Sequence, residues 1–208
     1  MLVPSIKNLI FDLGGVILDL SVDHTLQSFA KLSKMPKEKV YEIYHGTPGF
    51  LDYEKGSIDD ATFRDFLRQT FSISADDATL DETWNAMLRG IPAVKLDLLT
   101  RLQSEFRVFL LSNTNAIHIH HINEVMLARD NGKRLLDSYF HKAYYSHRMG
   151  KRKPDADIFE QVLEENRLVP EQTLFLDDYD INIEGAKSLG IKTLHVTSPN
   201  LILDYFHA

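Results

Sequence analysis

Short, largely hydrophobic runs recur along the chain, and each of them is followed by polar residues. The runs are Asn8 to Phe11, Val108 to Leu111, Leu174 to Leu176 and Thr193 to Val196. A short apolar run bounded by turn or polar residues is typical of a strand that is buried on both faces. We therefore predict four buried strands, with polar side chains gathered at their carboxyl ends.

Amphipathic segments lie between several of these runs. One of them follows Pro154, which we expect at the first helical position, and it carries Ile158, Phe159, Val162 and Leu163 on one face. Strands that alternate with helices indicate an α/β fold with a parallel sheet. In such folds ligands bind at the carboxyl ends of the strands.

Residues 21–89 interrupt this alternation, because no strand-like run occurs there and several amphipathic helices can be drawn. Helices are expected to start at Pro36 and near Ser57, where Asp60 completes a capping-box pattern. A third helix is expected to carry the apolar residues Leu80, Trp84, Met87 and Leu88. We predict a core formed by residues 1–20 and 90–208, with residues 21–89 inserted as a helical cap over the end of the first strand.

Composition narrows the possible partners and locations. The 208 residues suit one core with a modest insertion, and the formal charge of -7 argues against nucleic-acid or anionic-membrane partners, which require basic patches. The absence of cysteine excludes disulfides and thiolate chemistry and fits a cytoplasmic protein. No apolar run reaches about 18 residues, so we expect no membrane insertion. The composition does not indicate an oligomeric state.

The residues that can carry chemistry stand at the predicted strand ends and before one predicted helix. They are Asp12, Ser112, Asn113, Lys153, Asp177 and Asp178. The Asp12 carboxylate can act as a nucleophile, and the acidic pair can hold a hard cation through oxygen ligands. Ser112, with a helix expected to begin directly after it, suits a bound phosphate. Lys153 would relieve repulsion between carboxylate and phosphate, each unit pair being worth about 4 kcal/mol at ~4 Å and an effective dielectric of ~20.

At these residues the chain resembles the haloacid dehalogenase superfamily, most of whose members are phosphatases. Residues 9–16 (LIFDLGGV) resemble the first motif of that family, and residues 110–115 (LLSNTN) resemble the second. Residues 150–155 (GKRKPD) resemble the third, and the fourth is matched by residues 176–178 (LDD) with Asn182, Gly185 and Ala186. The particular residues in these motifs are similar to those of bacterial sugar-phosphate phosphatases of the alpha-D-glucose-1-phosphate phosphatase type. The resemblance implies a Rossmann-like core with a helical cap of the C1 type.

Carried over by position, the resemblance implies a magnesium-dependent phosphatase that forms a phosphoaspartate on Asp12. Asp12 would also bind Mg²⁺, together with the Gly14 carbonyl and Asp178, with Asp177 partly behind them. The phosphate of a small metabolite, such as an aldose 1-phosphate, would contact Ser112, Asn113 and Lys153.

Position 14 departs from the pattern of many phosphatases of this superfamily, which have a second Asp there as general acid and base. Glycine cannot move a proton, and losing positioned proton transfer typically reduces the rate by ~10²–10⁴. We therefore expect a preference for phosphates with good leaving groups, such as aldose 1-phosphates over 6-phosphates. Possible substitutes nearby in the sequence are Asp19, Asp23 and His24.

Other residues allow both a functional and a structural interpretation. His118 and His121 share a predicted helical face, but no acidic or cysteine partner stands at zinc-site spacing, so a solvated helix is favoured. Lys151 and Arg152 are expected in solvent. Three residues at the expected meeting of cap and core suit either substrate contact or packing: Phe50, Tyr53 and Glu54. His45 allows the same two interpretations.

Two rival functions remain at this point. A metal-independent 2-haloacid dehalogenase would also use Asp12, but it has no use for the acidic pair at 177 and 178. A non-catalytic sensor of phosphorylated metabolites could keep the site and lose turnover through Gly14.

Overall fold

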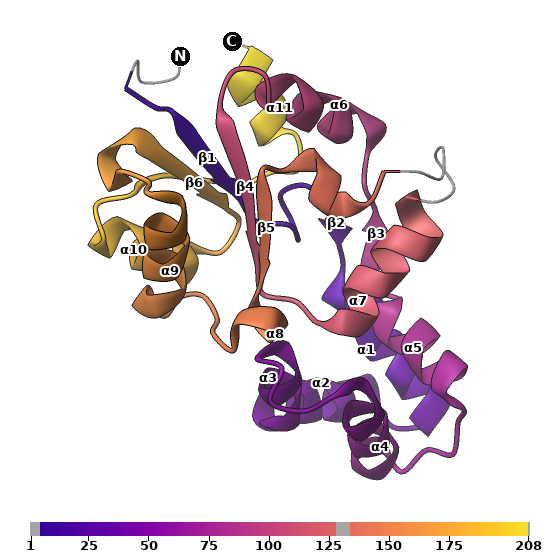
Figure 1. Cartoon of the computed structure of the whole chain (residues 1–208). Helices are drawn as coiled ribbons and strands as arrows, with labels where there is room; N and C mark the ends of the chain where they lie inside the picture. The colour runs from indigo at the N-terminus through magenta and orange to yellow at the C-terminus, as the bar shows by residue number, and fades with distance from the viewer. Residues whose placement is uncertain (1–4, 128–133, 208) are drawn as a thin grey trace.

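The computed structural model describes residues 5–127 and 134–207. Within these ranges five parallel strands form the central sheet, in the order β5-β4-β1-β6-β7. The strands are β1 (Asn8–Phe11), β4 (Arg107–Ser112), β5 (Lys142–Tyr145), β6 (Thr173–Asp177) and β7 (Lys192–His195). β1 lies at the centre, and all five strands point their carboxyl ends to one edge (Figure 1). The predicted α/β class with a parallel sheet is confirmed.

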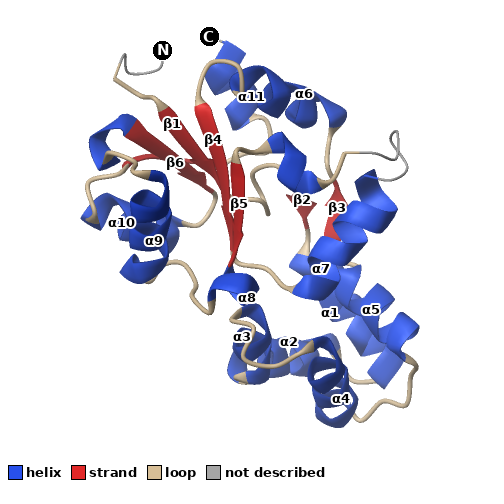
Figure 2. Cartoon of the chain, viewed as in Figure 1, coloured by secondary structure: helices blue, strands red, loops and turns tan. Residues whose placement is uncertain are grey.

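Helices cover both faces of this sheet (Figure 2). α6 (Ala93–Leu102) and α11 (Leu201–His207) lie on one face, and α9 (Ala156–Asn166) and α10 (Asp180–Ser188) lie on the other. The short helices α7 (Ala116–His121) and α8 (Ser146–Met149) follow the carboxyl ends of β4 and β5. Side chains of β1 alternate between the faces: Leu9 and Phe11 pack towards α6 and α11, whereas Ile10 packs towards α9 and α10. Because both faces are buried, the strands read as continuous apolar runs in the sequence.

An edge strand was missed from the sequence. β5 begins with the exposed Lys142 and continues through Ala143 to two tyrosines, so it offers no continuous aliphatic run. It pairs in parallel with β4, with Tyr145 opposite Ser112. As an edge strand it needs less apolar surface than the central strands.

A short antiparallel ribbon connects the sheet to a group of helices. Its strands are β2 (Asp19–Leu20) and β3 (Leu88–Gly90), with Asp19 opposite Gly90 and Leu20 opposite Leu88. Between them lie α1 (Val22–Ser33), α2 (Lys37–Gly46), α3 (Gly49–Glu54), α4 (Asp60–Phe71) and α5 (Asp77–Asn85). These five helices gather beyond the carboxyl edge of the sheet (Figure 1).

Several helix boundaries differ from the predictions. α5 ends at Asn85, so Met87 and Leu88 are not helical, because the chain there pairs with the ribbon: the Met87 carbonyl accepts from Ser21 N at 2.9 Å. The predicted capping box at Ser57 and Asp60 is wrong. Asp59 caps α4 instead, its side chain accepting from Thr62 N at 2.8 Å.

The helix predicted to start at Pro154 also begins later. α9 starts at Ala156 with Asp155 as its N-cap residue, so Pro154 precedes the helix. The helix expected at Pro36 does begin there, since α2 starts at Lys37 directly after it.

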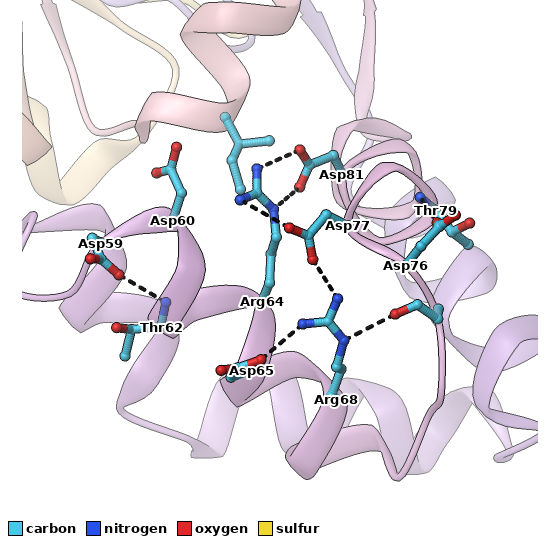
Figure 3. Close-up of polar contacts among 12 residues, drawn as sticks. Asp59, Asp60, Thr62, Arg64, Asp65, Arg68, Asp76, Asp77, Thr79 and Asp81 are labelled. Carbon is cyan, nitrogen blue, oxygen red and sulfur yellow. Dashed lines mark hydrogen bonds and ion pairs between the residues drawn. The ribbon is translucent and has the colours of Figure 1, made fainter.

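Charged side chains join α4 to α5 on the outside of the helical group (Figure 3). Arg64 donates from Nε and a terminal nitrogen to the two oxygens of Asp81, at 2.8 and 2.7 Å. Arg68 contacts Asp77 and, at 2.9 Å, Asp65. On the inner side the rings of Phe63 and Trp84 meet edge to face with centroids 5.1 Å apart. The pair of helices is therefore held on both sides.

Candidate active site

The register of the sheet brings the polar ends of two strands to the same level. Phe11 lies opposite Leu176 in the pairing of β1 with β6, so Asp12 follows β1 beside Asp177. The Asp12 N–H donates to the Leu176 carbonyl at 2.8 Å and continues the ladder by one residue. Both aspartates are buried, and the fold therefore concentrates negative charge at the carboxyl edge of the sheet.

Lys153 reaches this point from the loop before α9. Its Nζ donates to Asp12 Oδ1 at 2.7 Å and to Asp177 Oδ2 at 2.6 Å, and its side chain is 1% exposed. Asn113 holds the Lys153 backbone from both sides: its amide donates to the Lys153 carbonyl and its oxygen accepts from the Lys153 N–H, each at 2.9 Å. The second and third predicted motifs are thus joined by hydrogen bonds.

The buried charges shift one another's pKa values. Burial raises the pKa of Asp12 above its usual value, against the opposing charge of Lys153, and neighbouring Asp177 adds to the rise. Burial alone would lower the pKa of Lys153, but Asp12 and Asp177 together raise it. Asp178 is exposed at the surface, but partial desolvation of its carboxyl group by the surrounding site and the charge of Asp177 raise its pKa. One ammonium group therefore faces a cluster of carboxylates whose negative charge it does not fully offset.

Asp12, Asp177 and Asp178 each offer a carboxylate oxygen within 4.8 Å of the other two. A set of hard oxygen ligands with excess negative charge is what Mg²⁺ requires. Asp177 is also engaged by the protein, since Asn182 donates to it at 3.0 Å and Tyr179 N at 2.8 Å. These bonds orient Asp177 and leave Asp178, which is exposed, the freer of the pair.

The glycine pair after Asp12 allows the chain to pass close to this cluster. Gly15 has φ +72°, and a Cβ built on it would lie 2.1 Å from Asp178 Oδ2. Any side chain there would displace the carboxylate. At Gly14, a Cβ would meet Leu20 Cδ2 at 3.2 Å, so Leu20 stands where a side chain of residue 14 would extend.

The surroundings of Ser112, a predicted phosphate contact, differ from those expected. Ser112 is buried at the end of β4, but the helix expected to follow it begins only at Ala116. The first helical N–H groups are taken by the protein: Asn115 Oδ1 accepts from His118 N at 3.0 Å, and Tyr53 Oη accepts from Ile117 N at 3.3 Å. These two N–H groups are therefore not available for an anion. Thr114 N is also taken, since it donates to Ser146 Oγ at 2.9 Å, so a phosphate here would depend on the other polar groups of residues 112–116.

Two neighbouring hollows open around Gly14 and Asn113. A cleft of about 510 Å³ is lined by Asp12, Lys153 and Asp178 among others. A smaller cavity of about 110 Å³ is lined by Ser112 and by side chains of the helical group: Tyr44, Glu54 and Trp84. Gly14, Leu20, Val22 and Asn113 belong to the walls of both. The helices thus enclose space next to the carboxylate cluster.

Some of the remaining candidate residues on the helices between β2 and β3 serve in packing, and one of them lines the cavity. Phe50 and Tyr53 are buried in the helical core, where Tyr53 stacks on Phe63 with centroids 3.9 Å apart. His45 lies next to Tyr41, with ring centroids 4.3 Å apart. Glu54, in contrast to Phe50 and Tyr53, lines the cavity.

Two expectations of solvated side chains are wrong. His118 is buried, stacks on Trp84 with centroids 5.0 Å apart, and its Nδ1 lies 2.8 Å from Asn85 Oδ1. Arg152 is half-buried and donates to Glu54 Oε2 at 3.3 Å. No local pattern in the sequence predicts either partner, because both contacts join residues after β4 to helices that lie between β2 and β3.

The substitutes considered for the missing acid have other partners. Asp19 accepts from the buried Lys95 at 3.2 Å, Asp23 pairs with Lys37, and His24 lies 2.8 Å from Ser21 Oγ.

Comparison with known proteins supports the family resemblance. A family model described as haloacid dehalogenase-like hydrolase matches residues 6–190. A D-ribitol-5-phosphate phosphatase from Bacteroides thetaiotaomicron is 34% identical over 191 residues, covering 90% of each chain.

Two similar solved structures share the fold over nearly their whole length. A family enzyme of Bacteroides thetaiotaomicron in complex with magnesium and inorganic phosphate is 37% identical, with a TM-score of 0.84 over 91% of this chain and 93% of that one. A predicted hydrolase of the family from Porphyromonas gingivalis is 31% identical, with a TM-score of 0.86 over 98% of this chain and 97% of that one.

In residues 5–127 and 134–207 no helix is long and apolar enough to cross a membrane. The chain belongs to the haloacid dehalogenase-like hydrolases.

Proposed function

We propose that the chain is a magnesium-dependent phosphatase of small polyhydroxylated metabolites, acting through a phosphoaspartate on Asp12. The observation that carries this proposal is the meeting of Asp12, Asp177 and Asp178 around the buried Lys153 at the carboxyl edge of the sheet. A carboxylate beside a cation site and an ammonium group can attack an anionic phosphate, because the repulsion between the two anions is offset.

The carboxylate cluster fits Mg²⁺. Asp12, Asp178 and the Gly14 carbonyl would hold the ion. Asp177 would lie partly behind these ligands, with its carboxylate held in place by hydrogen bonds from Asn182 and Tyr179 N. When bound, the ion would offset negative charge on the phosphate oxygens. A phosphate would contact Lys153, Ser112 and Asn113, of which Lys153 and Asn113 line the cleft together with Asp12.

The substrate class rests on two supports. A relative of similar length is named a D-ribitol-5-phosphate phosphatase, which favours sugar or alditol phosphates. The wall of the cavity beside the cleft includes the carboxylate of Glu54 and the hydroxyl of Ser112 among apolar side chains, and these two polar groups suit contact with hydroxyls of a leaving group. Residues 21–89 would act as the cap that closes over this leaving group, with residues 1–20 and 90–208 as the catalytic core. We place the enzyme in the cytoplasm.

A phosphate-release assay over a panel of aldose 1-phosphates, aldose 6-phosphates and alditol phosphates tests the proposal. We expect phosphate release with Mg²⁺ and none in excess chelator. Bound phosphometabolite without release over the whole panel would instead favour a sensor. Chloride release from a 2-haloacid in excess chelator would favour a dehalogenase.

A further inference from the structure

The proposed reaction needs a proton at the leaving oxygen, and residue 14 cannot supply it. The space in front of Gly14 is taken by Leu20, whose Cδ2 would lie 3.2 Å from a Cβ at position 14. Asp19, Asp23 and His24 pair with other side chains and line neither of the two hollows. The donor must therefore come from another wall of the site.

Glu54, at the end of α3, is a carboxyl group in that wall. It lines the small cavity together with Gly14 and Ser112, and 24% of its side chain is exposed. The other titratable side chains in that wall are Tyr44 and His118. Burial raises the pKa of Tyr44 to about 12, and burial lowers the pKa of His118 to about 3. Neither group is matched to proton exchange near neutral pH.

The backbone around Glu54 is fastened to the core. Ser146 Oγ donates to the Glu54 carbonyl at 2.6 Å, and Ser146 is fully buried in α8. Two residues later Gly56, with φ +68°, passes so close that a Cβ would lie 2.0 Å from the His147 carbonyl oxygen. Glu54 is thus held by the core although it belongs to the inserted helices.

Arg152 completes the environment of Glu54. It donates to Glu54 Oε2 at 3.3 Å and lines the cleft that contains Asp12, so it spans the two hollows. Its buried Nε has no hydrogen-bond partner among residues 5–127 and 134–207, which leaves a donor for a ligand oxygen. Burial raises the pKa of Glu54 in spite of the opposing charge of Arg152, and this favours a carboxyl group that can hold and release a proton.

We propose that Glu54 is the proton donor and acceptor that position 14 lacks, with Arg152 as its positioning residue. This inference rests on the proposed phosphatase function. In the first step an Asp12 oxygen bonds to phosphorus, the bond from phosphorus to the leaving oxygen breaks, and that oxygen takes the Glu54 proton. In the second step the Glu54 carboxylate takes a proton from water, the water oxygen bonds to phosphorus, and the phosphorus–Asp12 bond breaks to release phosphate and restore both side chains.

If Glu54 supplies the proton, the native enzyme should not show the strong preference for aldose 1-phosphates that Gly14 alone predicts. The Glu54→Gln variant should show it. We expect Glu54→Gln to lower kcat on ribitol 5-phosphate by about 10²–10⁴ at saturating substrate. With 2,4-dinitrophenyl phosphate, whose leaving group needs no proton, the same variant should release one equivalent of dinitrophenolate at the native rate. Slow turnover should follow this burst, because the second step still lacks its base.

The chain offers a control and a rescue for this experiment. Glu164→Gln makes the same chemical change at an exposed position on α9 and should leave both substrates unaffected. Adding Gly14→Asp to Glu54→Gln returns a carboxyl group to position 14, provided that Leu20, which is 41% exposed, shifts by a few tenths of an ångström. The double variant should regain at least tenfold of the lost turnover on ribitol 5-phosphate.

Three outcomes would overturn the proposal: an unchanged kcat on ribitol 5-phosphate, an equal loss in the dinitrophenolate burst, or a double variant no better than Glu54→Gln. The first would show that no proton passes through Glu54, and the others would indicate a structural role. Native protein that releases no phosphate from any substrate would contradict the phosphatase function itself. That outcome is distinct from native activity that Glu54→Gln leaves unchanged.

Discussion

Asp12 is the residue on which the proposed chemistry depends, and its neighbours allow a nearly isosteric test. Asp12→Asn replaces the nucleophilic carboxylate with a neutral amide, while Asp177 remains as a partner for Lys153 at 2.6 Å. We expect turnover to fall by about 10⁴-fold or more. The melting temperature should stay at or above the native value, because one of several clustered carboxylates is gone. Phosphate release and circular dichroism measure the two effects, and residual turnover within tenfold of native would mean that water attacks directly.

Gly15 tests whether the close approach to Asp178 matters. Gly15→Ala places a methyl group 2.1 Å from Asp178 Oδ2 at φ +72°, so the loop or the carboxylate must move. We expect the apparent affinity for Mg²⁺ in the phosphate-release assay to fall at least tenfold. Gly150→Ala is the control, because Gly150 has φ +66° but no atom within 4 Å of its built Cβ. Similar magnesium affinities in both variants would show that the close approach of Gly15 to Asp178 does not affect the cation site.

His118 gives stability a dependence on pH. Burial lowers its pKa from 6.5 to about 3, so the folded protein keeps it neutral where the unfolded chain takes up a proton. Its contribution is therefore complete above pH 6.5 and is lost as the pH falls from there towards 3. We expect the native free energy of unfolding to fall more steeply than that of His118→Phe between about pH 6 and 4, by up to about 1.4 kcal/mol per pH unit.

Urea unfolding at several pH values measures this difference. His118→Phe keeps a ring against Trp84 but removes the partner of Asn85 Oδ1, so the variant should be less stable at pH 8 by about 1–3 kcal/mol. The two stability curves should then converge towards acid. Parallel curves would show that His118 does not titrate on unfolding.

At the scale of residues, the sequence predicted the groups at strand ends and missed those that depend on the inserted helices. Asp12 and Asp177 end apolar runs, and the register of a parallel sheet brings such ends together without further information. The sequence places Arg152 and His118 in solvent because their partners, Glu54 and Trp84, lie 98 and 34 positions away along the chain. No local pattern encodes a contact of that range.

At the scale of elements, α4 and α5 are joined by charge on one side and by aromatic rings on the other. Arg64→Met removes the paired bonds to Asp81 but keeps much of the aliphatic stem, and Arg64 is 19% exposed whereas Asp81 is 28% exposed. We expect a loss of about 1–3 kcal/mol in the free energy of unfolding, because paired bonds to a charged group exceed ordinary surface pairs.

Lys39→Met is the matched control for this change. Lys39 and Glu42 form an ion pair with both side chains largely exposed, and breaking it should alter stability by less than about 0.5 kcal/mol. Chemical denaturation of both variants gives the comparison. Equal effects would mean that the Arg64 contacts carry no more than a surface pair does.

The elements that the sequence placed wrongly share a physical cause. β5 is an edge strand with a charged residue and tyrosines, so it lacks the apolar run that marks β1, β4 and β6. Met87 and Leu88 fit a helical face, but the ribbon with β2 takes the backbone hydrogen bonds of this segment. Tertiary pairing therefore overrides the local preference at both positions.

At the scale of the whole molecule, the uncompensated carboxylate cluster should make the fold respond to Mg²⁺. An ion that binds the folded state at a hundred times its dissociation constant adds about 2.7 kcal/mol, which raises the melting temperature of a chain of this size by about 5–10 °C. Asp178→Asn should abolish most of this rise, and Asp157→Asn, an exposed change on α9, should keep it. A native melting temperature that Mg²⁺ leaves unchanged would contradict the cation site.

The ribbon of β2 and β3 has a consequence for how such a molecule can change over time. Because Asp19 lies opposite Gly90, the chain leaves the core and returns to it at a single point, like a loop on a closed stem. Residues added or removed between the two strands do not alter the strand order or the register of the central sheet. We therefore expect that the number of residues beyond this stem can change while the pairing that places Asp12 beside Asp177 stays the same.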